Sequence, residues 1–524
     1  MDYTLLGVII VYFIVVIGIG YYFCNKSSNL SDYILGGRSL NPYVTALSAQ
    51  ASDMSSWLLM GLPGAILIAG LGEVWLGIGL GIGTYASWLL IAKRLRVYTE
   101  VSKDSLTLST FFSNRFRDEK GYLRDVSAVI ILVFFVIYVA SGFVGAGKVF
   151  NFVFEDVSYS VSIIVAAAVI VIYTFLGGFK AVCWTDFLQG MLMLIALVIV
   201  PLAAIATLGG WDGVTNIWDN VTSVDTSHFT DLFYDKGEKI KAITIVSLLA
   251  WGLGYFGMPH VIIRYTAIKH PNDLKIARRV AMVWLIVCLA ATSLVGLVGR
   301  AWLDGGSGYL IGGDGTLLGG GDAETIFITM AGGLFATVIA GIIYSAILAA
   351  VMSTADSQLL VASSAISNDL YKRFGKKGNL GDKHLIWISR VVVAVIAVIA
   401  AAIALSGNNS IMDLVSYAWA GFGAAFGPVV LCALFWKGAN AKGALAGMIA
   451  GFFTVILWNT FMKSDAIIGG GSYMLFDTGI YEIIPGFIIA MVLIFVVSKL
   501  TGGPEKEVLD EYGVYEEEMK KLSE

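Results

Sequence analysis

Hydrophobic residues occur along this chain in long runs that short polar segments separate. Runs of about 20 apolar residues, the length that an α-helix needs to cross a bilayer, recur from Leu5 to Val497. The runs lack the alternating ten-residue pattern of a membrane β-barrel. We therefore expect about thirteen membrane-spanning helices. Their expected ranges are 4–24, 42–69, 74–95, 125–150, 159–177, 184–207, 240–260, 276–300, 325–360, 386–405, 411–435, 441–461 and 480–499.

Composition agrees with an all-α polytopic membrane protein. Hydrophobic residues make up 57% of the 524 positions and charged residues only 14%, whereas soluble domains have about 25% charged residues. The start Met1-Asp2-Tyr3 has no basic segment, so we expect the first run to be a retained span rather than a signal peptide. The four cysteines lie in or beside apolar runs and are expected to be packing residues. A net charge of −4 gives no indication of nucleic-acid binding.

The charges of the connecting segments predict the orientation in the membrane. Basic residues gather at 93–124, 264–279, 372–383 and 437–442, whereas acidic residues gather at 212–235 and 304–324. The positive-inside rule then places the N-terminus outside and the C-terminus in the cytoplasm. The charged tail at 501–524 is expected to be a solvated cytosolic helix.

One stretch, Leu47 to Gly64, is polar although it lies in an apolar region. Asp53 at this depth costs about 2.5–3.5 kcal/mol, and Gly61 and Pro63 favour a break that frees backbone carbonyls. The other polar side chains of the stretch are Ser48, Gln50, Ser52, Ser55 and Ser56. We interpret the stretch as a cation site at a broken helix. A polar seam between two helices is the alternative interpretation.

A second break is expected five spans later, at Trp251 to His260, where three glycines and a proline interrupt an apolar helix. Two interrupted spans in corresponding positions indicate a transporter with an inverted repeat, although two unrelated kinks would give the same pattern. The predicted divisions are the first span and its loop (1–41), the first repeat (42–207), an outer loop (208–239), the second repeat (240–436), two further spans (437–500) and the tail (501–524).

The ninth span offers a second wall for the cation site. Ala350, Ser353, Thr354 and Ser357 have the spacing of one helical face, and hydroxyl and carbonyl oxygens suit a small hard cation. Serine hydroxyls that bond to their own backbone are the alternative.

Asp186 is the other acid close to the membrane. It stands near the expected start of the sixth span, where it would cap the helix or occupy its first turn. Alternatively it attracts a cation leaving toward the cytoplasm, together with Asp356 and Ser357.

Aromatic residues beside the breaks predict an organic substrate. Trp251, Tyr255 and Pro259 have helical spacing, and Tyr138 and Gly142 on the fourth span pair an aromatic ring with a small residue. Packing is the usual role of such residues, but beside a broken helix they favour a wall for a small substrate. The spans with the breaks have no central Arg or Lys, which favours a zwitterion bound at a half-helix N-terminus.

Other classes of function are less well supported. The four histidines are isolated from one another, so no metal-ligand cluster is expected. There is no Walker A pattern, so we expect no ATP coupling within this chain. The sequence lacks the recognisable selectivity filter or ring of charged residues that is typical of a channel.

The ordered motifs of the chain resemble those of the sodium:solute symporter family, and in particular its bacterial sodium/proline symporters. The motifs are DYILGGR at 32–38, SDMSSWLLMGLPG at 52–64, FFVIYVASG at 134–142, YTFLGGF at 173–179, WTD at 184–186, WGLGYFGMPH at 251–260, SAILAAVMST at 345–354, SYAWAGFGAAFGP at 416–428 and YEIIPGF at 481–487. The chain departs from many members at Met258, where Gln is expected.

The resemblance implies a LeuT-type fold with five-plus-five inverted repeats and discontinuous second and seventh spans. It implies that sodium is bound by Ala51, Met54, Ala350, Ser353 and Thr354. It implies a proline site at Tyr138, Trp251, Tyr255 and Pro259, to which we add Ser55 and Gly142. It also implies that Asp53 and Ser55 are needed to couple sodium to transport, without necessarily binding the ion. To this group we add Asp186, Asp356 and Ser357. Arg38 is expected to act in cytosolic gating.

From these observations we expect sodium-coupled uptake of L-proline by alternating access, in the bilayer of a bacterial inner membrane. Sodium is expected as the co-transported ion. We expect no enzyme activity, and neither ATP nor nucleic acid as a partner. The alternatives are a symporter of the same family for another small solute, and, in a different class, a channel or a membrane sensor that binds proline.

Overall fold

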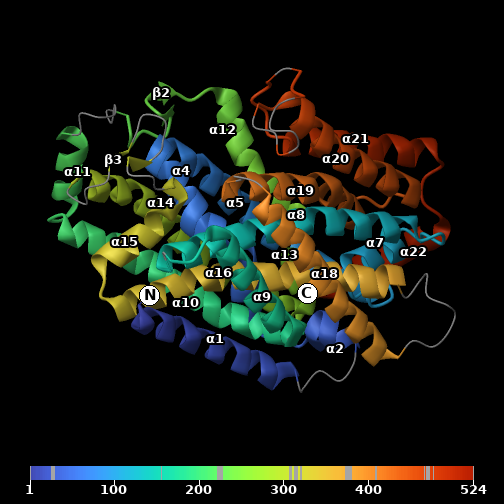
Figure 1. The fold of residues 1–524 in the computed structure, drawn as a ribbon. Helices are drawn as coiled ribbons and strands as arrows, with labels where there is room; N and C mark the ends of the chain where they lie inside the picture. Colours follow the sequence, from blue (N-terminus) through green and yellow to red (C-terminus); the bar gives the residue numbers. More distant parts are fainter. Residues whose placement is uncertain are drawn as a thin grey trace.

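The fold is built almost entirely from helices (Figure 1). The computed structural model describes residues 2–24, 30–154, 156–176, 178–220, 228–305, 310–311, 317–318, 322–371, 381–406, 410–464, 467, 473–475 and 477–522. The first half contains α1 (Tyr3–Cys24), α2 (Leu30–Leu35), α3 (Pro42–Asp53), α4 (Leu62–Ala69), α5 (Val74–Ala86), α6 (Ala92–Val101), α7 (Leu108–Arg115), α8 (Tyr122–Val153), α9 (Tyr159–Leu176), α10 (Phe179–Thr207) and α11 (Trp211–Asn220). The second half contains α12 (Ala242–Leu249), α13 (Pro259–Ala267), α14 (Leu274–Asp304), α15 (Ile326–Leu334), α16 (Thr337–Ser364), α18 (Asp382–Leu405), α19 (Ile411–Phe435), α20 (Ala441–Met462), α21 (Ile483–Leu500) and α22 (Lys506–Lys521). Two small hairpins complete it, β1 (Tyr234–Asp235) with β2 (Glu238–Lys239), and β3 (Leu310–Ile311) with β4 (Leu317–Leu318).

The described helices include ten that are long and apolar enough to cross a membrane, and two bent helix pairs raise the number to twelve. The apolar part of α9, Tyr159–Phe175, is shorter than these. The all-α polytopic class and the two discontinuous spans are therefore confirmed, while the expected thirteenth span stays a prediction. Large apolar side chains such as Ile14, Val283 and Val398 are exposed on the outside of the bundle, as a lipid-facing surface requires.

The first bent pair joins α3 to α4 at an angle of 62°. Asn41 caps the start of α3 by accepting a hydrogen bond from the Val44 amide, 2.9 Å away. The helix ends at Asp53 because Met54 leaves the helical region, with φ −83° and ψ 80°. Asp and Ser residues compete with the helix by forming local hydrogen bonds, and here the Ser55 amide bonds to the Asp53 carbonyl at 3.0 Å.

The second bent pair joins α12 to α13 at 43° through a tight 3-10 segment, Ala250–Phe256. Pro259 is the first residue of α13, where its missing amide proton costs nothing. The 3-10 segment crosses α5 so closely that a Cβ atom at Gly83 would lie 2.2 Å from the Gly252 carbonyl oxygen. The glycines on both elements permit this contact, because any side chain would force the helices apart.

Two expected helix boundaries are wrong. The predicted span 325–360 is two helices, α15 and α16, because Phe335 and Ala336 take extended backbone angles between them. The predicted start at residue 184 is also wrong, since α10 begins at Phe179. Apolar composition continues through both places, so hydropathy alone does not mark either boundary.

The tail forms a largely exposed helix, α22, as expected, but one face of it, with Val508, Tyr512 and Tyr515, is buried against α6 and its neighbours. The Tyr515 ring stacks on the Tyr98 ring with centroids 4.2 Å apart and an interplanar angle of 7°. Glu511 forms a 2.7 Å ion pair with Arg117, and burial raises the pKa of the Glu511 carboxyl. The many charged residues of α22 predicted a solvated helix, so its buried aromatic face with Tyr512 and Tyr515 was not expected from the sequence.

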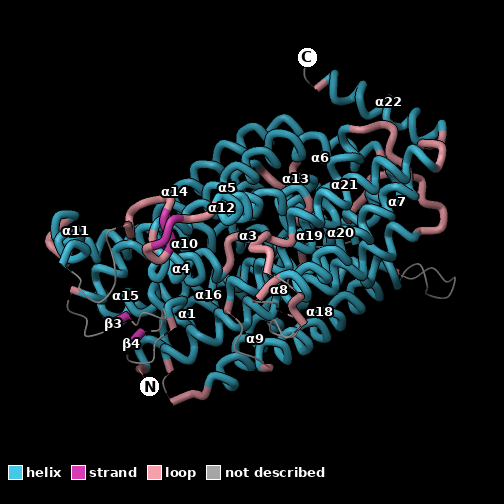
Figure 2. The backbone as a smooth tube through the Cα atoms, turned by 90° about the horizontal axis from the view of Figure 1, so that it is seen from above, coloured by secondary structure: helices cyan, strands magenta, loops and turns pink. Residues whose placement is uncertain are grey.

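The elements that carry the acidic and basic connections lie at opposite ends of the molecule. Figure 1 shows α11 and β3 at the left end and α7 and α22 at the right end, and Figure 2 shows the two chain termini at opposite ends. Part of the third basic segment, residues 372–380, lies outside the described residues. The side of the membrane that each end faces stays a prediction.

Candidate functional site

Backbone and hydroxyl oxygens gather where the break after α3 meets α16. The Ser353 hydroxyl donates to the Ala51 carbonyl at 2.8 Å and lies 3.2 Å from the Ala350 carbonyl. The Thr354 hydroxyl lies 3.5 Å from the same Ala51 carbonyl. All of these residues are buried. The cluster is of the kind that a small hard cation binds, because such ions take several oxygen ligands.

The helix break makes the Ala51 carbonyl available to this cluster. In an uninterrupted helix the Ser55 amide would donate to Ala51, but here it donates to Asp53. Met54, the remaining predicted ligand, is the first residue beyond α3, and its amide donates to the Gln50 carbonyl at 2.9 Å. Ser353 and Ser357 also bond within α16, since the Ser357 hydroxyl donates to the Ser353 carbonyl at 2.7 Å.

Asp53 connects the two broken spans directly. Its carboxylate accepts a hydrogen bond from the Tyr255 hydroxyl in the 3-10 segment of the second break, and its carbonyl accepts one from the Trp57 indole at 3.0 Å. The second carboxylate oxygen, Oδ1, is buried without a hydrogen-bond partner in the described part of the chain. The side chain therefore joins α3 to the second break rather than to the hydroxyls of α16.

The aromatic residues predicted for the substrate site do not share one face. Tyr255 points to Asp53 and packs edge-on against Trp419 at 5.0 Å, whereas the Trp251 ring lies 6.4 Å from Trp419 in a stacked arrangement. Pro259 lines a cavity on the far side of the break whose lining contains neither Trp251 nor Tyr255. The expected spacing assumed one regular helix, and the 3-10 winding and the 43° bend remove that assumption.

On the fourth span, α8, Tyr138 faces the first break. Its ring is buried beside Ser55 and Trp57, and its hydroxyl has no hydrogen-bond partner among the described residues. Gly142 lies one turn further along α8, where a Cβ atom would approach Val351 to 3.3 Å. The hydroxyl lies near polar groups of Ser55 and Trp57 without a well-formed hydrogen bond to either, so it can bond to a polar ligand.

A buried polar network lies behind the oxygen cluster, and its centre is Arg264. The sequence placed Arg264 in a basic loop, but it is a fully buried residue of α13. Its guanidinium lies 3.3 Å from Asp186 and 3.2 Å from the Ser48 hydroxyl, and it also donates to Ser357. Its assignment to a loop is therefore wrong, because α13 extends further than the apolar run. Arg264 lies in the last turn of α13 and not at the centre of the interrupted span, so the expectation that these spans carry no central cation is not contradicted.

Asp186 and Asp356 both belong to this network. Asp186 is not a helix cap, since α10 begins two turns earlier, and it accepts a 2.7 Å hydrogen bond from Ser48. Asp356 accepts a 3.2 Å hydrogen bond from Ser357, while its other oxygen has no partner among the described residues. Two buried carboxyl groups thus share the neighbourhood of one guanidinium.

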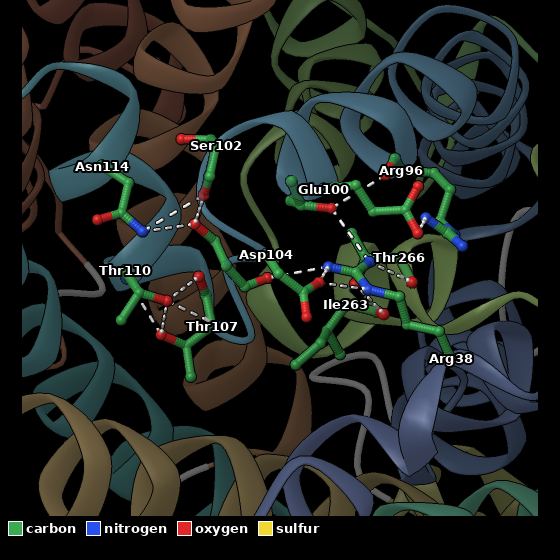
Figure 3. Close-up of polar contacts among 12 residues, drawn as sticks. Arg38, Arg96, Glu100, Ser102, Asp104, Thr107, Thr110, Asn114, Ile263 and Thr266 are labelled. Atoms are coloured by element: carbon green, nitrogen blue, oxygen red, sulfur yellow. Dashed lines mark hydrogen bonds and ion pairs between the residues drawn. The ribbon is translucent and has the colours of Figure 1, made fainter.

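Arg38 holds three segments of the chain together (Figure 3). Its guanidinium forms a 2.9 Å ion pair with Asp104 and donates to the Thr266 carbonyl at 2.8 Å and the Thr99 hydroxyl at 3.2 Å. Burial, and then the nearby Arg96, lower the pKa of this guanidinium, while Asp104 opposes the shift. Arg38 therefore joins the loop before α3 to α13 and to the α6–α7 connection.

Two adjacent cavities run beside this Arg38 contact. Thr107, Leu108 and Ile263 line both of them, the first cavity reaches Pro259, and the second reaches Thr266. Figure 3 shows Ile263 between Thr107 and the Arg38 cluster. The Arg38–Asp104 pair thus lies near two small cavities between the second break and the α6–α7 connection.

Sequence reasoning missed several residues of the site. Arg264, Ser48, Trp419 and Tyr481 were not assigned to it, although Ser48 was noted as polar and the last two lie in the matching motifs. A polar residue inside an apolar run was a usable signal for Ser48, whereas Arg264 lies beyond the expected run and gave no such signal. Trp419 and Tyr481 gave no such signal, because aromatic residues are common in membrane helices.

Comparisons with known proteins identify the family and the fold of the chain. The model of the family described as "Sodium:solute symporter family" matches residues 33–451. The osmoregulated proline transporter OpuE of Bacillus subtilis is 45% identical, covering 98% of each chain. A sodium/proline symporter of Staphylococcus aureus is 45% identical, covering 95% of this chain and 92% of its own. A solved Na⁺-coupled sialic acid symporter, 17% identical, has a TM-score of 0.76 over 96% of this chain and 99% of its own. The LeuT-type fold expected from the sequence is thereby confirmed.

The Arg264 network supplies a prediction about stability. Removing one partner of a buried ion pair leaves an uncompensated charge, so Arg264→Met should reduce the free energy of unfolding by about 3–5 kcal/mol. Thermal unfolding of the purified protein in detergent measures the loss. Adding Asp186→Asn to Arg264→Met should restore part of it, whereas Lys521→Ala, which breaks the exposed pair with Glu518, should change nothing. Equal unfolding temperatures for the wild type and Arg264→Met would contradict the prediction.

Proposed function

Because this chain belongs to the sodium:solute symporter family, we propose that it couples sodium entry to the uptake of L-proline by alternating access. It is a multi-pass protein of a bacterial plasma membrane and not an enzyme. The observation that carries the proposal is the contact of the Ala51 carbonyl, freed by the first break, with the Ser353 hydroxyl of α16. Curated relatives with names that specify proline, at 45% identity, support the choice of substrate.

Sodium occupies the oxygen cluster between α3 and α16 in this proposal. Its ligands are the Ala51, Met54 and Ala350 carbonyls and the Ser353 and Thr354 hydroxyls. When sodium is bound, the Ser353 hydroxyl turns its lone pairs to the ion instead of donating to Ala51. The ion then replaces the direct hydrogen bond as the link between the two helices.

L-Proline occupies the space between the two breaks. In this proposal Trp251, Tyr255 and Pro259 contact its apolar ring from different directions, because the 3-10 winding and the bend separate them. Gly142 contacts the ring from α8, and the Tyr138 and Ser55 hydroxyls supply polar contacts. Its carboxylate faces the N-terminus of α13, where the helix dipole favours a negative charge. A proline zwitterion needs no bidentate cation, which agrees with the engagement of Arg264 by Ser48, Asp186 and Ser357.

Coupling follows from the bond between Asp53 and Tyr255. Sodium binding fixes the break after α3, and Asp53 transmits this order to the 3-10 segment that contacts proline. Asp186, Asp356 and Ser357 act in sodium coupling from the cytosolic half, and Arg38 opens or closes the cytosolic side. The end with α7 and α22 faces the cytoplasm, and the N-terminus faces outward.

The driving force is sufficient for strong accumulation. One charge that moves through 100 mV yields about 2.3 kcal/mol, and a tenfold sodium gradient adds about 1.4 kcal/mol. With one sodium ion per proline, the two sources together sustain a proline gradient of roughly 500-fold.

Transport by purified protein in proteoliposomes tests the function. We expect labelled L-proline to accumulate with an inward sodium gradient and to stop accumulating when a sodium ionophore is added. Without a gradient, internal unlabelled proline should drive counterflow in the presence of sodium. Uptake without counterflow would indicate a channel, and binding without uptake would indicate a sensor. Preferential uptake of another solute would show that the protein is a symporter for that solute instead of proline.

The sodium site predicts a large effect of removing both hydroxyls on α16. Ser353→Ala with Thr354→Ala should raise the sodium concentration for half-maximal uptake at least about tenfold, because each lost oxygen contact costs about 1–3 kcal/mol. The sodium dependence of proline uptake provides the measurement. Ser345→Ala is a matched control, since this buried hydroxyl bonds only within its own helix, to Gly341. An unchanged sodium requirement in the double variant would place the ion elsewhere.

Asp53 predicts a separation of sodium activation from proline binding. Asp53→Asn keeps the size of the side chain but removes its charge, so sodium activation should weaken at least about tenfold. Proline affinity measured at saturating sodium should change much less. The exposed Asp212→Asn is the control for loss of one carboxylate. Equal losses of sodium activation and proline affinity would assign Asp53 to the substrate site instead.

A further inference from the structure

The connection between α20 and α21 brings one aromatic residue to the second break. Tyr481 is 7% exposed, and its ring stacks on Trp251 with centroids 5.4 Å apart and an interplanar angle of 25°. Tyr481 lies outside both predicted repeats, in the pair of helices that follows them. The stack therefore links the outer helix pair to the 3-10 segment of the core.

Hydrogen bonds fix the Tyr481 side chain and backbone from several directions. Its hydroxyl donates to the Ser416 carbonyl of α19 at 2.6 Å. Its amide donates to the Ser247 hydroxyl of α12 at 3.1 Å, and Ser247 in turn donates to the Gly479 carbonyl at 3.2 Å. The Trp458 indole of α20 donates to the Ile480 carbonyl at 3.2 Å. This many constraints hold the ring in one orientation.

Trp419 of α19 contacts the same segment from the core. Its indole nitrogen donates to the Trp251 carbonyl at 2.7 Å, and its ring lies so close to Gly254 that a Cβ atom there would be 2.0 Å from the indole nitrogen. Trp419 thus adds a side-chain hydrogen bond to a carbonyl of the 3-10 segment, while Tyr481 contacts the Trp251 side chain. The backbone of Trp251 is held by Trp419 of α19, and its ring stacks both on Trp419 and on Tyr481 of the α20–α21 connection.

We propose that Tyr481 is a positioning residue that orients the Trp251 indole for L-proline binding. The inference rests on the proposed function, in which Trp251 contacts the substrate. Its consequence is that the α20–α21 pair contributes to substrate affinity although it lies outside the two predicted repeats. Because Tyr481 acts on Trp251 and not on the oxygen cluster of α3 and α16, its loss affects proline and not sodium.

The test compares variants that keep or remove the ring. Tyr481→Ala should raise the KM for proline about 3- to 10-fold, the range that one aromatic pair accounts for, with Vmax and the sodium requirement unchanged. Tyr481→Phe retains the stack and should keep the KM near the wild-type value. Tyr481→Leu keeps most of the volume without the ring and should behave as Tyr481→Ala, and it serves if the smaller side chain impairs folding. Tyr473→Ala is the control, since this tyrosine of the same connection is 60% exposed.

A double-mutant cycle identifies the route of the effect. If Tyr481 acts through the indole, adding Tyr481→Ala to Trp251→Leu should raise the KM no further than Trp251→Leu alone. Additive effects, an unchanged KM in Tyr481→Ala and Tyr481→Leu, or an equal rise in the sodium requirement would each overturn the proposal. Absence of sodium-driven proline uptake by the wild-type protein would overturn the proposed function itself, which distinguishes the two failures.

Discussion

The structure depends on pairing backbone polar groups in a region that water does not reach. An interrupted helix exposes carbonyls that have no partner in the lipid phase, so each interruption requires a partner from another helix. At the first break Ser353 bonds to the Ala51 carbonyl, and at the second the Trp419 indole bonds to the Trp251 carbonyl. The Asp53–Tyr255 bond then joins the two breaks. Each interruption is stabilised by a tertiary contact, and exchanging such a contact for an ion or a substrate alters helix packing with little loss of pairing.

Much of the fold was predictable, because length, hydropathy and the Gly/Pro interruptions are properties of local sequence. Those signals located both broken spans and the hydroxyl face that includes Ser353. They did not separate α15 from α16, since the residues at that boundary are as apolar as their neighbours. They also treated Trp251, Tyr255 and Pro259 as one face, because helical spacing holds only while the helix stays regular.

Arg264 illustrates a different limit of sequence reasoning. Counting basic residues in loops assigns orientation correctly only if each counted residue lies in a loop, and Arg264 is buried in α13 instead. Its partners Ser48, Asp186 and Ser357 come from three other helices that are distant in sequence. No local pattern indicates that these groups meet. A cation buried among them orders four helices at once, because each hydrogen bond has a fixed direction.

The docking of α22 has a consequence for how the protein is made. Tyr98 and Arg117 are synthesised long before their partners Tyr515 and Glu511, and 394 positions separate Arg117 from Glu511. Until α22 has been synthesised, the surface of α6 and of the α7–α8 connection that it contacts stays exposed. Contacts between residues so far apart in sequence form slowly. This surface can therefore close only after the helices between α8 and α22 have been synthesised, so the docking of α22 follows them in the order of assembly.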